Sequence, residues 1–160
     1  MQKITVLCVG KLKEKFYLDA VAEYVKRLSR FCKLEIIELP EERLPEDPSP
    51  AQIEAALSKE ADAVRAKLPN GCLVIAMCVE GRERSSEELA RYLADSAAQG
   101  ASHIVFLIGS SYGMHPSLKQ QADLRLSMSP MTFPHHLLRV MLLEQIYRAY
   151  QINAGSRYHK

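Results

Sequence analysis

The stretch CLVIAMCVEGRERSSEELARYLADSAAQGASHIVFLIG, residues 72–109, holds two apolar runs on either side of one helical pattern. The runs at residues 72–79 and 103–109 are almost continuously apolar, which is typical of strands buried on both faces of a parallel sheet. Between them, Ser85 and Glu88 have the spacing of a capping box, and Gly100 is a usual helix stop. The stretch predicts a strand, a helix and a second strand.

The same alternation extends in both directions along the chain. Further strands are predicted at residues 4–10, 34–39 and 124–129. Further helices are predicted at residues 14–30, 49–68 and 134–153, with a short helix after Pro116. The pattern predicts an α/β fold, with a mainly parallel sheet of five or six strands sandwiched by helices. We expect one domain spanning residues 1–160.

The composition favours a protein of the cytoplasm. Apolar residues make up 48% of the chain and charged residues 25%, as in ordinary globular proteins. No apolar run approaches the ~20 residues of a membrane span, and the N-terminus does not resemble a signal peptide. The four cysteines have no C-x-x-C spacing, so we expect reduced core thiols and no metal site.

The charge is uneven along the chain although the net charge is only +2. Residues 1–33 carry a net charge of +5, residues 34–66 carry −6 and residues 101–160 carry +4. Basic ends around an acidic middle indicate an anionic partner that the two ends contact. A solvated surface explains any single charged run equally well.

Loops at the carboxyl ends of the strands are where open α/β sheets bind ligands. Three such loops stand out: GKLKEK after the first strand, EGRERSS after the third and GSSYGMH after the fourth. Gly109 and Gly113 fit neither G-x-G-x-x-G nor G-x-x-x-x-G-K-[ST], which argues against a nucleotide hydrolase. Two glycines that simply close a turn remain an alternative.

The segment SMSPMTFPHH, residues 127–136, is stiffened by Pro130 and Pro134. Such an extended backbone exposes carbonyls and amides to which a flat ring such as adenine could bind edge-on, although a plain connector fits as well. His135 and His136 follow at the positive end of a helix, which favours neutral imidazoles. A core or capping role for them is as reasonable as a catalytic one.

The last helix has more apolar surface than one sheet can cover, and a second copy of the chain is the simplest partner for it. The chain then ends in SRYHK, residues 156–160, hereafter the tail. A polar terminus is disordered by default. A cation, an aromatic ring and an imidazole in succession can also hold a phosphate, stack on a base and move a proton.

These segments together resemble one family over essentially the whole chain, the large-subunit ribosomal RNA methyltransferases H of the SPOUT class. The matching stretches are ITVLCVGKLKEKF, LIGSSYGMH, LSMSPMTFPHHLLRVMLLEQIYRAYQI and the terminal YHK. The resemblance implies a homodimer and a C-terminal trefoil knot. It also implies methyl transfer from S-adenosylmethionine to N3 of pseudouridine 1915 in 23S ribosomal RNA, on the assembled ribosome. The sulfonium donor carries an activated methyl group, so no metal ion is expected.

The resemblance also implies the donor-binding residues, whereas the chemistry of the tail, of Arg139 and of the basic ends indicates the catalytic and RNA-binding residues. The expected donor-binding residues are Met77, Gly109, Met128, Ser129, Pro130, Met131, Thr132 and Phe133. The expected catalytic residues are His159 as proton acceptor, Tyr158 against the base and Arg139 on a phosphate. The expected RNA-binding residues are Arg157, Lys160, Lys11 and Lys13.

One residue departs from the family pattern, because Ser110 stands where a second glycine is usual. If that glycine needs a positive φ or a close backbone contact, Ser110 would strain the loop. The alternative function is a non-catalytic module that binds the ribosome through its basic ends and has no donor pocket.

Overall fold

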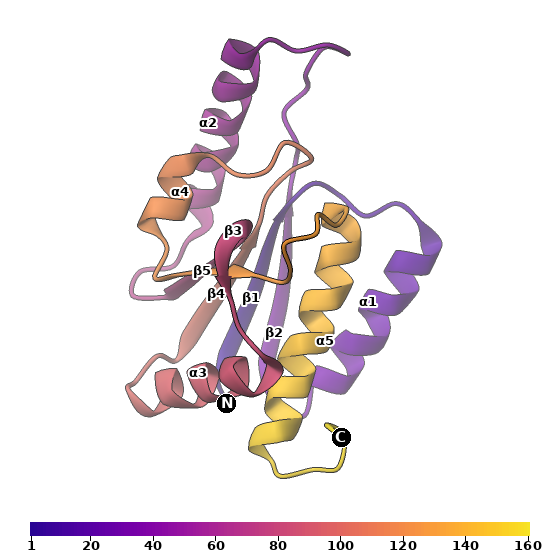
Figure 1. Cartoon of the computed structure of the whole chain (residues 1–160), viewed down its shortest axis with the longest axis vertical. Helices are drawn as coiled ribbons and strands as arrows, with labels where there is room; N and C mark the ends of the chain where they lie inside the picture. Colours follow the sequence, from indigo (N-terminus) through magenta and orange to yellow (C-terminus); the bar gives the residue numbers. More distant parts are fainter.

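A five-stranded parallel sheet in the order β2-β1-β4-β3-β5 forms the centre of the computed structural model, which describes residues 1–160 (Figure 1). The strands are β1 (Lys3–Val9), β2 (Lys33–Leu39), β3 (Leu73–Glu83), β4 (His103–Ile108) and β5 (Leu124–Ser127). The three continuously apolar runs occupy the interior positions, β1, β4 and β3, where both faces are covered. The predicted α/β fold with a parallel sheet is therefore confirmed.

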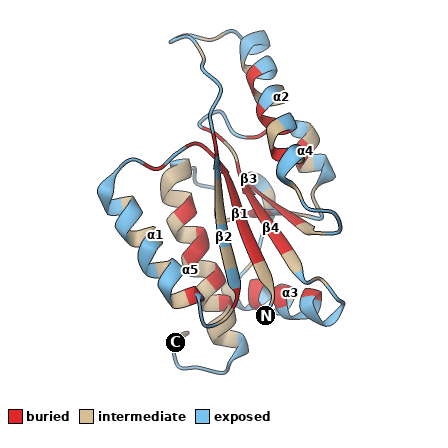
Figure 2. Ribbon diagram, turned by 180° about the vertical axis from the view of Figure 1, so that it is seen from behind, coloured by how far each residue is buried: buried red, intermediate tan, exposed pale blue.

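Helices cover both faces of this sheet because successive side chains of each strand point to opposite sides. One face carries α1 (Lys15–Leu28), α3 (Ser86–Ala98) and α5 (His135–Asn153) over the larger core. The other carries α2 (Pro50–Lys67) and α4 (Pro116–Gln121). Figure 2 shows buried residues along the central strands and on the inner sides of the helices. No helix has both the length and the apolar content needed to cross a bilayer.

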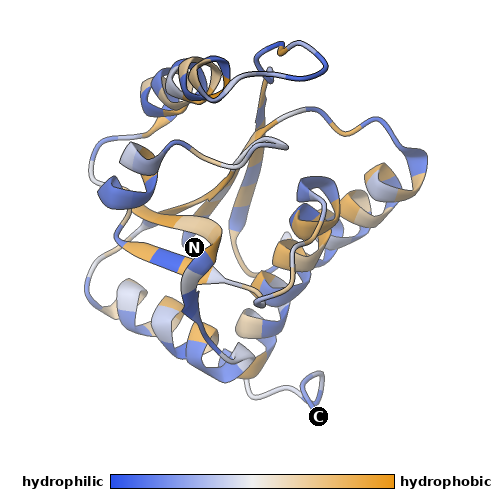
Figure 3. Ribbon diagram, turned by 45° about the horizontal axis from the view of Figure 1, so that its top comes forward, coloured by the Kyte–Doolittle hydropathy of each residue, from blue (hydrophilic) through white to orange (hydrophobic).

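The helix ends lie within about two residues of the predicted ones because the capping signals are local. Ser85 accepts a hydrogen bond from the Glu88 amide at 3.1 Å, and the Glu88 carboxylate accepts one from the Ser85 amide at 2.7 Å. α5 begins at His135, directly after Pro134. Along α5, hydrophobic colour recurs on several sides of the helix in Figure 3, as the sequence indicated.

β3 is longer than predicted and pairs twice with the same residue of β5. Leu126 is the partner of Met77 and, after a register shift, also of Arg82. The chain between these two residues therefore turns around β5, and in Figure 1 the magenta ribbon of β3 passes across the orange β5. The predicted strand stopped at residue 79 because the residues that follow are polar.

Gly81 lies directly against the backbone of β5 at this crossing. A Cβ atom at position 81 would be 2.8 Å from the carbonyl carbon of Arg125 and 2.9 Å from the amide nitrogen of Leu126. Real Cβ atoms do not approach a backbone so closely. The crossing therefore requires glycine, and the trefoil knot implied by the resemblance stays a prediction.

Arg139 fixes the start of α5 to the carboxyl ends of β1 and β2. Its guanidinium donates to Glu38 at 2.5 Å and to the Gly10 carbonyl at 3.1 Å, and its side chain is 1% exposed. Burial opposes ionisation of Glu38, but hydrogen bonds from the Leu12 amide and from Arg139 outweigh it and lower the pKa of Glu38. The expectation that Arg139 holds an RNA phosphate does not fit this geometry, because the guanidinium is buried inside the fold.

Replacement of Gly81 by alanine is expected to lower the free energy of unfolding by about 1–3 kcal/mol, because the added methyl group forces two backbones apart. Urea denaturation followed by circular dichroism measures this change. Arg82→Ala is the matched control, since Arg82 is exposed and keeps the same strand pairing. Equal stability of the two variants would show that the crossing tolerates a side chain.

Candidate functional site

A cavity of about 660 Å³ opens at the carboxyl ends of β3, β4 and β5. Its walls come from residues 77–80 in the middle of β3, from residues 109–114 after β4 and from residues 127–135 at and after the end of β5. We call residues 109–113 the glycine loop and residues 128–134 the proline loop. Sheet topology predicts a ligand site at this edge, and the structure has a cavity there.

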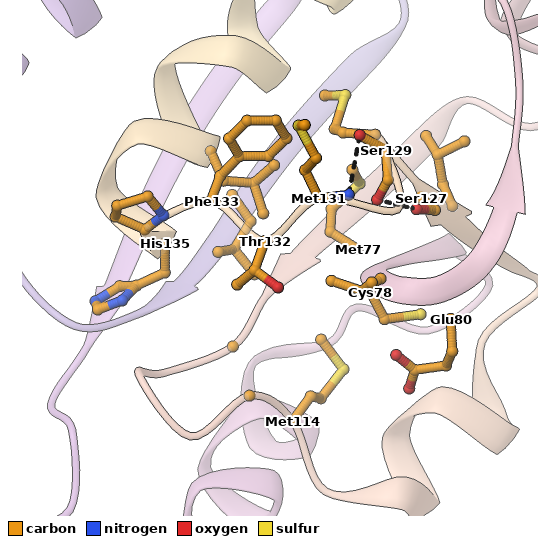
Figure 4. Close-up of a pocket in the computed structure, with 18 of the residues that line it drawn as sticks. Met77, Cys78, Glu80, Met114, Ser127, Ser129, Met131, Thr132, Phe133 and His135 are labelled. Carbon is orange, nitrogen blue, oxygen red and sulfur yellow. Dashed lines mark hydrogen bonds between the residues drawn. The ribbon is translucent and has the colours of Figure 1, made fainter.

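The structure brings most of the expected donor-binding residues together around this cavity. The seven that line it are Met77, Gly109, Met128, Ser129, Met131, Thr132 and Phe133. Pro130 is exposed and does not line it. Figure 4 shows Met131, Thr132 and Phe133 from the proline loop facing Met77 across the cavity. Contact with a donor remains a prediction for all of them.

The backbone of the proline loop is largely free of internal partners. No backbone–backbone hydrogen bond involves residues 128–133. Two side-chain bonds shape the turn: the Ser127 hydroxyl donates to the Ser129 carbonyl at 3.0 Å, and the Met131 amide donates to the Ser129 hydroxyl at 3.0 Å (Figure 4). The remaining carbonyls and amides can bind the edge of a flat heterocycle, as the two prolines suggested.

The glycine loop is a tight turn in which Gly109 is indispensable. A Cβ atom on Gly109 would be 2.3 Å from the Gly113 carbonyl oxygen. Ser110 and Gly113 exchange two backbone hydrogen bonds of 3.0 and 2.8 Å, and Gly113 has a φ of +88°. Ser110 has no positive φ, so this departure from the family pattern brings no strain of that kind.

Ser110 instead binds a buried carboxylate. Its hydroxyl donates to Glu60 Oε1 at 2.8 Å, while Glu60 Oε2 accepts from the Glu42 amide at 2.9 Å. Glu60 is 6% exposed, and burial raises its pKa. The next residue, Ser111, donates its hydroxyl to Glu41 at 2.5 Å. The glycine loop is thus attached to α2 and to the chain after β2.

Three of the cavity residues outside the predicted set are His135, Glu80 and Lys119. His135 lies at one end of the cavity, and Glu80 and Lys119 form an ion pair at its wall. Burial, followed by the neighbouring His136, lowers the pKa of His135, whose Nε2 atom is buried without a partner. Glu80 begins the loop EGRERSS, which the sequence indicated as a candidate ligand loop. No sequence motif pointed to Lys119.

The tail packs on its own chain and does not reach the cavity. The Tyr158 hydroxyl donates to Glu144 at 2.8 Å, and its ring meets the Tyr147 ring edge-on at 4.9 Å. Arg148 lies over the Tyr158 ring at 4.7 Å and binds Glu144 at 2.7 Å. The pair of Glu144 and Arg148 is half-buried and holds the tail.

Both ring nitrogens of His159 are occupied. Its Nε2 lies 2.7 Å from Glu87 on α3, and its Nδ1 lies 3.2 Å from the guanidinium of Arg148. No residue of the tail lines the cavity. In this arrangement His159 cannot take a proton from a molecule in the cavity of its own chain.

The expected RNA-binding residues are exposed but lie in two groups. Lys11 and Lys13 follow β1, near the start of α5. Arg157 and Lys160 follow the end of that helix, whose 19 residues span about 28 Å. Figure 1 shows the C-terminus at the end of the molecule that carries the N-terminus, away from the carboxyl edge. One chain therefore does not gather these cations into one patch.

Removal of the Ser110 hydroxyl by Ser110→Ala is expected to lower the free energy of unfolding by about 1–3 kcal/mol, because a buried carboxylate loses a hydrogen bond. A second change, Glu60→Gln, should recover part of this loss, since an amide is less costly to bury than a carboxylate. Urea denaturation of the single and double variants measures the coupling. Ser111→Ala is the control, because its bond to Glu41 is exposed. Equal losses for the two serines would contradict the account.

Comparisons with known proteins agree with this geometry. A family model described as "Predicted SPOUT methyltransferase" matches residues 2–159. A protein of Streptococcus uberis is 48% identical, and one of Bifidobacterium adolescentis is 49% identical. Both are named ribosomal RNA large subunit methyltransferase H, and each alignment covers 99% of both chains.

A solved structure, that of a probable methylase family protein from Haemophilus influenzae, superposes with a TM-score of 0.53 at 13% identity. The match covers 98% of this chain and 70% of that one, and at this identity it supports the fold alone. The full-length family match and the two close relatives support membership of a family as well as a fold. The chain belongs to the SPOUT methyltransferase family.

Proposed function

We propose that this protein transfers a methyl group from S-adenosylmethionine to N3 of pseudouridine 1915 in 23S ribosomal RNA, on the assembled ribosome in the cytoplasm. The observation that carries the proposal is the cavity at the carboxyl edge, where seven residues expected to bind the donor come together. The names of the full-length relatives support ribosomal RNA as the substrate.

The cavity suits a ligand of the size and chemistry of this donor. Its volume of about 660 Å³ lies within the range of small-molecule sites, roughly 300–1,000 Å³. Apolar side chains such as Ile108, Met114 and Leu138 line it beside the free backbone groups of the proline loop. This combination fits a flat base that is bound by its edge and packed on its faces.

The donor supplies a methyl group already activated by the sulfonium. The residues of the chain then have to orient the reactants and exclude water, and orientation can contribute several kcal/mol. The two short turns described above, at Gly109–Gly113 and at Ser127–Met131, hold the cavity walls before any ligand binds. Rigid walls of this kind fix the direction in which a bound methyl group points.

The N3 proton of the base needs an acceptor, and His159 is the proposed one, with Tyr158 against the base. Because the tail does not line the cavity of its own chain, we assign it to the cavity of a second copy. α5 has half-buried apolar side chains available for a homodimer, among them Leu137, Val140 and Met141. Two copies would also bring Arg157 and Lys160 of one chain closer to Lys11 and Lys13 of the other.

The alternative, a ribosome-binding module without catalysis, is supported by the exposed cations at both chain ends alone. It gives no role to the cavity or to the free backbone of the proline loop. A single methylation assay distinguishes the two functions, because only an enzyme modifies the RNA.

Ribosomes from cells that lack the gene should gain one methyl group at the target pseudouridine when incubated with the protein and S-adenosylmethionine. Primer extension across the site measures the product. His159→Gln, which keeps one hydrogen-bonding group but accepts no proton, is expected to slow single-turnover methylation by about 100-fold. Unmodified ribosomes with the wild-type protein would contradict the function, and an unchanged His159→Gln rate would contradict the base assignment alone.

Mixed dimers test whether the tail acts in the second copy. One chain carries Gly109→Ala, whose added methyl group collides with the Gly113 carbonyl and displaces the turn beside the cavity, and the other carries His159→Gln. Heterodimers purified through two different tags should regain about half of the wild-type rate, because one of two symmetric sites is intact. Thermal unfolding of each variant controls for folding. Inactive heterodimers would place the tail and the cavity of one chain in the same site.

A further inference from the structure

The lining of the carboxyl-edge cavity holds one carboxylate and one ammonium side chain. Of its 21 lining residues, these are Glu80 and Lys119. Glu80 comes from β3 and Lys119 from α4, two elements far apart in the sequence. Their side chains form an ion pair in which Lys119 is 23% exposed and Glu80 57% exposed. All other charged residues of the protein lie outside this lining.

The ion pair gives the cavity two different ends. Figure 4 shows the Glu80 carboxylate beside Cys78 and near Met114, while Phe133 and His135 lie at the opposite end. The second end has no carboxylate and no lysine or arginine, and it carries the free backbone groups of the proline loop. An elongated ligand with one flat, weakly polar end and one charged end would match this arrangement.

A sulfonium methyl donor of the adenosyl class has this shape. Its adenine is flat and neutral, and its amino-acid end carries an ammonium and a carboxylate on one carbon. We propose that Glu80 binds the ammonium and Lys119 the carboxylate of the donor's amino-acid end. This inference rests on the proposed function. It names the residues by which the site would distinguish the donor from other adenosine compounds.

The ion pair in the ligand-free protein is suited to such an exchange. Each charge already has a partner, so the empty cavity contains no isolated charge whose burial would be costly. The pair is partly exposed, so the two side chains separate at low cost. A hydrogen bond from Lys119 lowers the pKa of Glu80, which keeps its carboxylate ionised at neutral pH. Binding then replaces one ion pair by two.

Calorimetry with two ligands tests the inference. S-adenosylhomocysteine and 5′-methylthioadenosine are both adenosine thioethers, and only the first has the amino-acid end. Lys119→Met and Glu80→Gln are each expected to weaken S-adenosylhomocysteine about tenfold, as loss of a charged hydrogen bond does. Their affinity for 5′-methylthioadenosine should stay unchanged, which also shows that the variants fold. Lys67→Met, an exposed lysine of α2, is the control.

Two results overturn the assignment while leaving the donor site in place. An unchanged affinity for S-adenosylhomocysteine in both variants would show that these side chains do not contact the amino-acid end. A parallel weakening of both ligands would show that the ion pair only ties β3 to α4. A third result, no binding of either ligand to the wild-type protein, would instead remove the proposed function and the inference with it.

Discussion

The close contact between Gly81 and the backbone of β5 is the constraint on which the rest of the structure depends. Because position 81 has no side chain, β3 can pass close to β5 and pair with Leu126 through both Met77 and Arg82. This double pairing fixes the end of β5 beside the end of β3. The proline loop that leaves β5 then faces Met77, and the space between them becomes the cavity. Backbone geometry at one glycine thus positions the site.

An ion pair between the buried Arg139 and the partly exposed Glu38 supports the opposite end of the cavity from behind. Arg139 holds the start of α5 against Gly10 and Glu38, and so places His135 at the end of the cavity. A buried guanidinium is stable only with such partners, and removal of one partner leaves an uncompensated charge. The fold therefore uses this arginine for structure. The exposed cations of the tail and of the loop after β1 remain the proposed RNA contacts.

The sequence allowed the sheet, the helix ends and most of the cavity lining to be predicted, because apolar runs and capping residues act locally. The extension of β3 was missed, since its polar residues gain strand structure only by pairing around β5. The bond between Ser110 and Glu60 joins residues 50 apart, and the ion pair of Glu80 and Lys119 joins residues 39 apart. Such partners follow from the fold, and no local pattern reveals them. The position of the tail depends likewise on Glu87, Glu144 and Arg148.

The central claim is that the turn around β5 creates a slot for an adenosyl sulfonium compound. A crystal structure of the protein with S-adenosylhomocysteine tests it most directly. The account predicts density for adenine along the free backbone of residues 128–133, with the thioether sulfur near Met77 and Gly109. Density for the ligand at another surface, with this slot empty at saturating concentration, would contradict it.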